Sequence, residues 1–379
     1  MYMDWNKFEN DESILEYLSK LPRYKNTSLK SMISRARFLL SLMYCRFFNV
    51  DKPLFTVLVT NNTCNFKCDY CYGNYGNRKG IPDFSTKQLL KIIDELKGMG
   101  TRILTLHGGE SLLRKDFGEI LNYAKLKGFY VGFNSNGALV PKRVNELKSL
   151  DLLCISMDGR EENNDKHRGK GSFNKALTAL DVARENNIPI AIHVTLTKNN
   201  VTDMKYLSEL GREKKFTIQY SILYNTNKVD NNLVLSDEEI RKTMKMIYDF
   251  KRQGYPIYYG SKVYLNAIRW PGSCNVGFFT KKDRNHTKGL NLIPCYHGKL
   301  KYQIDADGRV VTCWAHNYPD APNINKLGLK EALNQCKQKK DCEFCCFIAN
   351  SEHNAVMHMS PTNIIELIFV HIGDILKIR

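Results

Sequence analysis

The sequence predicts an α/β protein whose main domain is a partial (β/α)6 TIM barrel. Six short apolar runs, each of strand length, recur between residues 55 and 223, and longer amphipathic stretches separate them. Strands that alternate with helices predict a parallel sheet with the helices outside it, because crossovers between parallel strands are right-handed. Six such units, where a closed barrel has eight, predict an incomplete barrel.

Each expected element of the barrel can be placed in the sequence. The six expected strands cover residues 55–60, 102–107, 129–134, 152–157, 188–195 and 216–223. A helix is expected over residues 86–96, because Leu89, Ile93 and Leu96 fall on one face at helical spacing. In a barrel of this type the chemistry belongs at the carboxyl ends of the strands. The residues that follow each strand are therefore the first candidates for a site.

Four regions are expected along the chain. They are an N-terminal helical segment over residues 1–50, the barrel core over 51–260, a cysteine-rich domain over 261–350 and an apolar C-terminal helix within 351–379. The second helix of the first region, over residues 29–48, mixes basic with apolar side chains. Residues 301–313 predict a hairpin, because a polar turn at 305–308 separates two short apolar runs.

The charge balance and the termini narrow the class of protein. The 379 residues include 56 Lys and Arg against 39 Asp and Glu, a formal charge of +17, which favours anionic partners. No arginine-rich tract or helix-turn-helix pattern is present, so a nucleic-acid partner is not expected. The N-terminus lacks the pattern of a secretory signal, and no segment has the apolar length of a membrane span. We therefore expect a cytoplasmic protein, in which clustered cysteines indicate metal or redox sites.

The first cysteine cluster directly follows the first expected strand. Cys64, Cys68 and Cys71 are spaced so that three thiolates on one tight loop can hold three irons of a [4Fe–4S] cluster. The fourth iron would then be open to a chelating ligand. Zinc is the alternative, but a closed structural zinc site needs four ligands, and no fourth Cys or His lies close by in the sequence.

A short motif ends the second expected strand. Gly108 and Gly109 would let a ligand approach the backbone closely, and the Glu110 carboxylate can receive an ammonium group. Together with the cysteine triad, this motif resembles the radical S-adenosylmethionine (SAM) superfamily. The resemblance implies that the open iron binds the amino and carboxylate groups of SAM and that the motif binds the methionine ammonium.

The same resemblance implies further SAM contacts at the ends of later strands. Ser135, Ser156 and Asp158 would lie near the adenosyl ribose and the methionine, and Arg168 near the SAM carboxylate. Each of these residues also fits a turn or helix-cap role. The resemblance further implies an electron donor such as flavodoxin or ferredoxin as a partner.

A second cysteine cluster lies in the C-terminal third. Its four members are Cys295, Cys313, Cys342 and Cys345. Four thiolates would saturate a second, auxiliary [4Fe–4S] cluster, and the arrangement resembles the twitch domain, a shortened SPASM domain. Four thiolates also suit structural zinc, so zinc remains an alternative here. Cys274 and Cys336 are alternative ligands.

Short motifs in the C-terminal third suggest a substrate class. Pro294-Cys295-Tyr296 and Asn354-Ala355-Val356 resemble the hopanoid-biosynthesis radical SAM enzymes, the adenosylhopene synthases. This implies a 5′-deoxyadenosyl radical that abstracts hydrogen from, or adds to, an apolar substrate such as a membrane lipid or isoprenoid. Residues 29–48 and 362–378 would then flank the barrel mouth at the inner face of an anionic membrane.

Two other functions fit the same motifs. A radical SAM maturase that modifies a peptide is one, although residues 1–50 show no winged-helix domain for peptide recognition. A non-catalytic iron–sulfur or zinc protein is the other, and the motif ending in Glu110 argues against it. The sequence names no residue that quenches the product radical.

Overall fold

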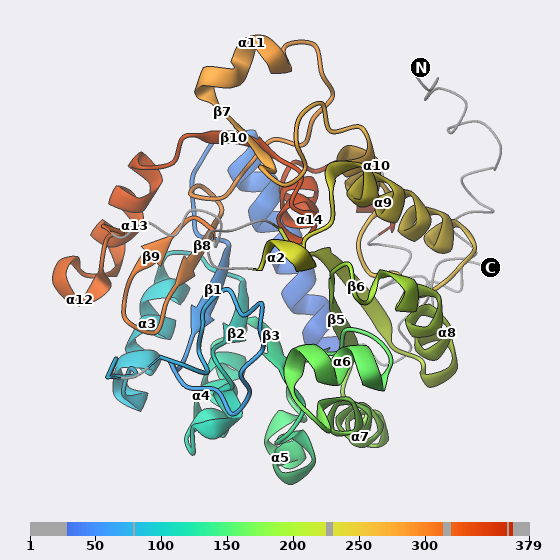
Figure 1. Ribbon diagram of the computed structural model, residues 1–379. Coiled ribbons are helices and arrows are strands. Elements are labelled where there is room, and N and C mark those ends of the chain that lie inside the picture. Colours follow the sequence, from blue (N-terminus) through green and yellow to red (C-terminus); the bar gives the residue numbers. More distant parts are fainter. Residues whose placement is uncertain (1–28, 79, 225–229, 314–319, 362–363, 367–379) are drawn as a thin grey trace.

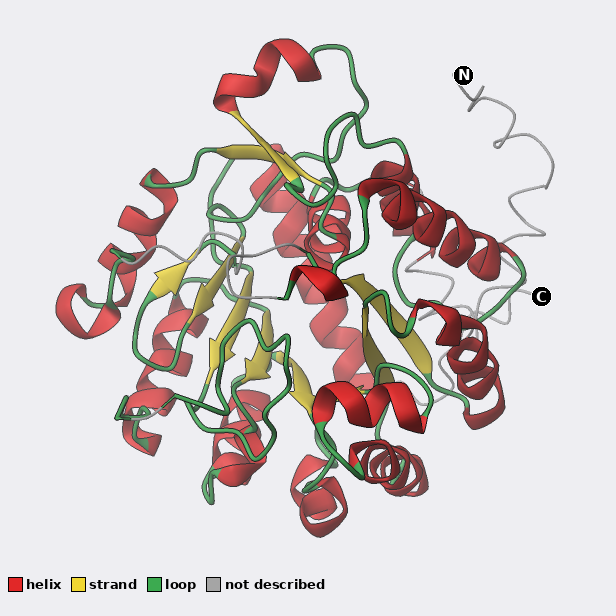
Figure 2. Ribbon diagram, viewed as in Figure 1, coloured by secondary structure: helices red, strands yellow, loops and turns green. Residues whose placement is uncertain are grey.

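The computed structural model describes residues 29–78, 80–224, 230–313, 320–361 and 364–366 (Figure 1). One eight-stranded sheet forms its centre, in the order β6-β5-β4-β3-β2-β1-β8-β9. Strands β1 to β6 pair in parallel in chain order, and helices surround them on the outside (Figure 2). The sheet does not close on itself. The expected partial barrel is therefore confirmed.

The six expected strands all form, with ends that shift by at most two residues. Their bounds are β1 Phe55–Val59, β2 Ile103–His107, β3 Tyr130–Ser135, β4 Leu152–Ser156, β5 Ile190–Leu196 and β6 Thr217–Ile222. The helices between and after them are α3 Thr86–Gly98, α4 Phe117–Leu126, α5 Val140–Leu147, α6 Glu161–Arg168, α7 Ser172–Glu185, α8 Met204–Lys214, α9 Asp237–Arg252 and α10 Ser261–Ile268. Helix α3 begins with a capping box in which Ser85 and Gln88 satisfy each other's backbone N–H groups.

The cysteine-rich region contributes to the same sheet. The expected hairpin is formed by β8 Lys301–Ile304 and β9 Val310–Val311, and β8 pairs in parallel with β1. Gly308 has a φ of 89°, a conformation that favours glycine in this tight turn. The remaining elements are β7 Phe278–Thr280, α11 Arg284–Thr287, α12 Ile324–Leu327, α13 Leu329–Gln338, β10 Cys342–Cys345 and α14 Ile348–Met357. The four expected region boundaries stay predictions.

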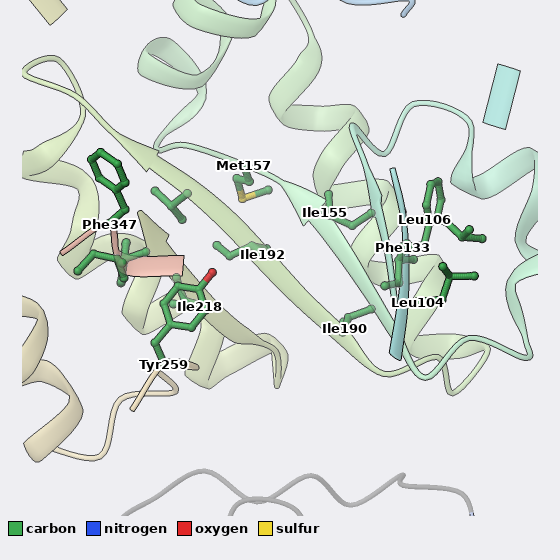
Figure 3. Close-up of a cluster of buried hydrophobic side chains, with 14 of the residues drawn as sticks. Leu104, Leu106, Phe133, Ile155, Met157, Ile190, Ile192, Ile218, Tyr259 and Phe347 are labelled. Carbon is green, nitrogen blue, oxygen red and sulfur yellow. The ribbon is translucent and has the colours of Figure 1, made fainter. Parts of the chain in front are cut away.

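The outer face of the sheet forms the core. Leu104, Phe133, Ile155 and Ile192 are fully buried between the strands and the surrounding helices (Figure 3). Since side chains alternate along a strand, the intervening residues point to the inside of the open barrel. The fold therefore has an apolar outer layer and a separate inner face.

Helix α2 (Leu29–Phe47) lies at the edge of the sheet where β1 to β3 begin, here called the amino edge. Phe38 and Leu42 pack there in one cluster with Phe55, the first residue of β1. Arg35 Nη2 donates to the Tyr130 hydroxyl at 3.2 Å, at the start of β3. The expectation that residues 29–48 flank the barrel mouth was therefore wrong, because their buried face docks on the opposite edge.

The expected C-terminal helix falls almost wholly on residues that the structure does not describe, since 362–363 and 367–379 lie outside the described ranges. Within the described part of the chain, no helix combines the length and apolar character needed to cross a bilayer.

Helix α2 offers a matched test of this docking. Leu42 is fully buried and Leu40 is 65% exposed on the same helix. We expect Leu42→Ala to lower the free energy of unfolding by about 2–5 kcal/mol, because it removes packed methyl groups and leaves a cavity. Leu40→Ala should change it by less than about 0.5 kcal/mol. Chemical denaturation of both variants measures the difference, and equal losses would contradict the placement of α2.

Candidate active site at the carboxyl edge

The first cysteine cluster lies on the loop after β1, at the carboxyl edge where the parallel strands end. Cys64, Cys68 and Cys71 are free thiols and are partly buried. Burial raises the pKa of Cys64, and raises that of Cys68 to about 11. Each of these two thiols is influenced electrostatically by Cys71, so the loop brings the triad together. Three soft sulfur donors in one place suit an iron–sulfur cluster or zinc.

The glycines after β2 support this loop directly. A Cβ on Gly109 would lie 2.1 Å from the Thr63 carbonyl oxygen, and one on Gly108 would lie 2.1 Å from Asn61 Oδ1. The backbone N–H of Glu110 donates to the same Thr63 oxygen at 2.9 Å. The sequence interpretation assigned the two glycines to ligand approach. In the structure their missing side chains make room for the segment that leads to Cys64.

Glu110 is fully buried and is held by the end of β3. Its Oε2 atom accepts from Ser135 Oγ at 3.0 Å and from the Asn136 backbone N–H at 2.8 Å. Its Oε1 atom accepts from the Leu112 N–H at 3.2 Å. Burial raises the pKa of this carboxyl group. The structure thus brings together Glu110 and Ser135, two of the residues expected around SAM.

Asn136 is a member of this group that the sequence interpretation missed. Its Nδ2 atom lies 3.8 Å from Cys64 Sγ and donates to Asn65 Oδ1 at 2.7 Å. Asn136 directly follows Ser135 at the end of β3, and this position is the sequence feature from which it could have been predicted.

A buried ion pair fixes the other end of the cysteine loop. Arg168 donates to Asp158 through Nε at 2.5 Å and through Nη2 at 3.1 Å. The Tyr70 hydroxyl, between the second and third cysteines, also donates to Asp158. Burial alone would raise the pKa of Asp158, but the Arg168 guanidinium holds it below its ordinary value. Arg168 was expected to donate to a SAM carboxylate. In the structure, two of its N–H groups already donate to Asp158.

A second contact joins the loop to α6. Asp69 Oδ2 lies 2.8 Å from His167 Nδ1, and the Asp69 N–H donates to the His167 carbonyl oxygen at 3.2 Å. Ser156, also expected near SAM, ends β4 in register with His193 of β5. The carboxyl edge thus gathers every residue expected to contact SAM, and their roles as contacts stay predictions.

The second cysteine cluster also comes together, beside β8. Cys295 and Cys342 have sulfur atoms 4.0 Å apart. Both Cys342 and Cys345 are influenced electrostatically by Cys295 and Cys313. Cys274 instead lies beside Cys346, whose Sγ is 3.8 Å from the Cys274 carbonyl oxygen.

Basic residues surround this second cluster. Lys301 is buried, and its Nζ lies 2.7 Å from His353 Nδ1. Burial lowers the pKa of Lys301 to about 8, against the opposing effect of the nearby cysteines. Lys340 Nζ donates to the Cys295 carbonyl oxygen at 2.6 Å. Lys340 lies two residues before Cys342 and Lys301 six residues after Cys295, but neither is part of a recognisable motif, so the sequence did not indicate them.

The spacing of the thiols bears on which metal they suit. In the described residues, no group of three or more His, Cys, Asp or Glu is close enough to hold a single metal ion. One tetrahedral zinc would bring its sulfur ligands to roughly 3.8 Å of one another. A cluster places each thiolate on a different iron. The Cys295–Cys342 sulfur distance of 4.0 Å is close to this zinc spacing, so the second set suits either metal.

The inner face of the barrel is largely polar. Its partly exposed polar residues are Thr105, His107, Asn134, Ser156, His193, Thr195, Gln219 and Ser221, whereas Val57, Ile103 and Leu152 on the same face are apolar. Burial lowers the pKa of His107 to about 4 and also lowers that of His193, so both imidazoles are neutral at pH 7. The alternation of side chains along each strand could have predicted which residues point to this face. Only the assembled sheet shows that residues from several strands meet there.

Comparison with known proteins decides the family. The model of the radical SAM superfamily matches residues 58–210, which contain the cysteine triad, Glu110 and Arg168. This part of the chain is a radical SAM segment. A segment of this superfamily indicates a [4Fe–4S] cluster and SAM as cofactors. The donor set at the carboxyl edge fits both.

Two curated relatives illustrate the range of radical SAM proteins that the chain resembles. It is 32% identical over 222 residues to the Fe-coproporphyrin III synthase of Methanosarcina barkeri, a match that covers 55% of each chain. It is 29% identical over 274 residues to the mycofactocin maturase MftC of Mycolicibacterium smegmatis, covering 70% of this chain and 65% of the relative. The matches thus span about half to two thirds of these relatives' lengths.

A solved structure supports the fold. Streptococcus suis SuiB bound to S-adenosylmethionine superposes with a TM-score of 0.59 at 16% identity, covering 76% of this chain and 67% of SuiB. The narrower resemblance to adenosylhopene synthases needs correction. The relatives that match include a synthase of Fe-coproporphyrin III and maturases, because the short C-terminal motifs are less specific than the barrel that the chain shares with them.

Substitution of Glu110 tests the predicted SAM contact. We expect Glu110→Gln to weaken SAM binding by on the order of 1–2 kcal/mol, because a charge-assisted contact to the ammonium becomes neutral. The amide would also place a donor among Ser135 Oγ and the Asn136 N–H. Calorimetric titration with SAM measures the affinity, and iron analysis shows whether the cluster still assembles. Glu119→Gln, on the exposed side of α4, is the control. Unchanged SAM affinity in Glu110→Gln would contradict the assignment.

Proposed function

We propose that this radical SAM protein modifies a peptide substrate. The observation that carries the proposal is the polar inner face of the barrel below the cysteine loop. Hydroxyl, amide and neutral imidazole groups there can pair with the N–H and C=O groups of a peptide, whereas a lipid would leave them without partners. This replaces the apolar substrate expected from the sequence.

The relatives support the same substrate class. Besides MftC, the chain is 24% identical over 275 residues to the sporulation killing factor maturation protein SkfB of Bacillus subtilis. SuiB has been solved bound to its precursor peptide SuiA. An electron donor such as flavodoxin or ferredoxin completes the proposed set of partners.

The triad Cys64, Cys68 and Cys71 would hold the SAM-binding cluster. When bound and reduced, that cluster would supply one electron for cleavage of SAM to methionine and a 5′-deoxyadenosyl radical. The chain's own residues position the reactants: Glu110 and Ser135 offer polar contacts to the methionine. The Asp158–Arg168 pair keeps Tyr70, and with it the loop, in one place.

We also propose that the second cysteine cluster holds an auxiliary [4Fe–4S] cluster in a twitch-like region. Cys295, Cys313, Cys342 and Cys345 would each bind one iron. Lys301 and Lys340 would offset part of the negative charge of four thiolates.

A tetrapyrrole is the second candidate substrate. The relative from Methanosarcina barkeri, at 32% identity, is named Fe-coproporphyrin III synthase, and the basic balance of the chain suits a substrate with several carboxylates. The substrate experiment below therefore includes this class.

Metal analysis tests the two cluster sites. The triple variant Cys64→Ala, Cys68→Ala and Cys71→Ala should retain roughly four of about eight irons after anaerobic reconstitution, because only the second site remains. SAM cleavage should be abolished. Cys45→Ala, a buried thiol outside both clusters, is the control and should keep both properties. Zinc in place of iron at the second site would refute the auxiliary cluster.

Protease treatment of a cell extract tests the substrate class. We expect a low-molecular-weight extract to stimulate formation of 5′-deoxyadenosine by the reconstituted enzyme, since many radical enzymes react fully only with substrate bound. Digestion of the extract with a broad-specificity protease should remove the stimulation, and extraction of lipids should not. Stimulation by iron coproporphyrin would favour the tetrapyrrole instead. Stimulation that survives protease but not lipid extraction would overturn the polar-substrate proposal.

A further inference from the structure

We infer that α2 docks this protein onto an anionic membrane surface through the face that it turns to solvent. This face consists of Leu40, Met43, Tyr44, Phe47 and Phe48, here called the apolar stripe. Their spacing of three, four and seven residues places the first four on one side of the helix. Phe47 is 84% exposed and Leu40 is 65% exposed. The inference does not depend on the substrate proposed above.

The stripe is not the side by which α2 joins the fold. Phe38, Leu42 and Cys45, on the opposite side, are at most 6% exposed and pack in one cluster with Leu54 and Met357. Helix α2 already buries one apolar face in the fold. In the described part of the chain, its second apolar face therefore has no structural role. Contiguous exposed apolar side chains of this kind mark interaction surfaces.

The charges around the stripe indicate what it binds. Helix α2 contains no Asp or Glu. Arg37 and Lys97 both reach Gly128, and their side-chain nitrogens lie 3.6 and 3.7 Å from the point where its Cβ would be. Arg102 donates to Ser41 of α2 at 3.0 Å. Burial, and then the neighbouring Arg102 and Arg37, lower the pKa of Lys97, which agrees with positive charges gathered at this edge.

Acidic residues do not neutralise this group. Among the residues that the structure describes, Arg37, Lys97 and Arg102 form no ion pair. Asp51, which follows the helix, pairs with Lys337 instead. A basic rim beside an apolar helix face is the pattern of a helix that lies in the plane of an anionic bilayer.

The same charges argue against a second copy of the chain as the occupant. Two copies that met through their stripes would bring two basic rims together, and like charges across an interface are costly. The end of the stripe is an aromatic group rather than a groove: the rings of Phe47 and Phe48 are 5.0 Å apart, as are those of Tyr44 and Phe48. Protruding aromatic rings suit insertion among lipid headgroups.

The docked orientation has a consequence for the enzyme. Helix α2 lies at the amino edge of β1 to β3, whereas the cysteine loop lies at the carboxyl edge. A membrane bound by the stripe would leave the active site facing the aqueous side. Membrane docking of this kind localises the enzyme without making a lipid its substrate.

Vesicle co-sedimentation of the full-length protein tests the inference. We expect binding to phosphatidylcholine vesicles that contain phosphatidylglycerol, weaker binding to phosphatidylcholine alone, and loss of binding as salt screens the rim. The double variant Phe47→Ser and Phe48→Ser should bind roughly tenfold or more weakly, because two rings no longer leave water. Arg37→Gln should weaken binding by roughly fivefold.

The chain provides a matched control. Met43→Ser, at a residue 51% exposed on the stripe, should weaken binding, whereas Met246→Ser, at a residue 46% exposed on α9, should not. SAM cleavage should stay unchanged in all of these variants, so a failure here is distinguishable from a failure of the proposed function. The inference is overturned if the wild type does not bind anionic vesicles at low salt. Equal binding by the stripe variants, or a dimer that the double Phe variant dissociates, would also overturn it.

Discussion

The close packing of residues 61–64 against Gly108 and Gly109 is the constraint on which the candidate active site depends. Any side chain at Gly109 would meet the Thr63 carbonyl oxygen at 2.1 Å and push the segment that leads to Cys64 away from the sheet. The next residue, Glu110, donates its N–H to the same oxygen. The first cysteine and the buried carboxylate are therefore positioned together, by one backbone contact between the ends of two neighbouring strands.

The rest of the cysteine loop depends on charge as well as packing. Asp158 accepts from Arg168 and Tyr70 in a buried group, and Asp69 contacts His167. Removing one partner of a buried pair leaves an uncompensated charge, so such groups hold a single arrangement strongly. Rigid support of this kind suits a site that must place a cofactor and a substrate accurately.

Strand β8 connects the two cysteine regions through the sheet. It pairs with β1, and the turn that follows it returns to the first loop: Ala306 packs with Val59, Cys64 and Cys71. Asp305, in the same turn, lies 3.1 Å from Arg78 Nη1. The hairpin thus touches the first cysteine loop and carries Cys313 toward the second cluster. The opposite edge of the sheet carries α2, so chemistry and the proposed membrane contact occupy opposite ends of the barrel.

The sequence by itself determined the strands, the order of the barrel and the residues of both cysteine clusters. Apolar runs of strand length and close cysteine spacing are local features, so they can be found without the fold. Glu110 and Ser135 were also found, because each directly follows a strand. Only the tertiary structure decided that Arg168 is paired with Asp158, that α2 lies at the amino edge and that Lys301 lies beside the second cluster. No local pattern specifies these contacts, because their partners depend on how helices and strands pack.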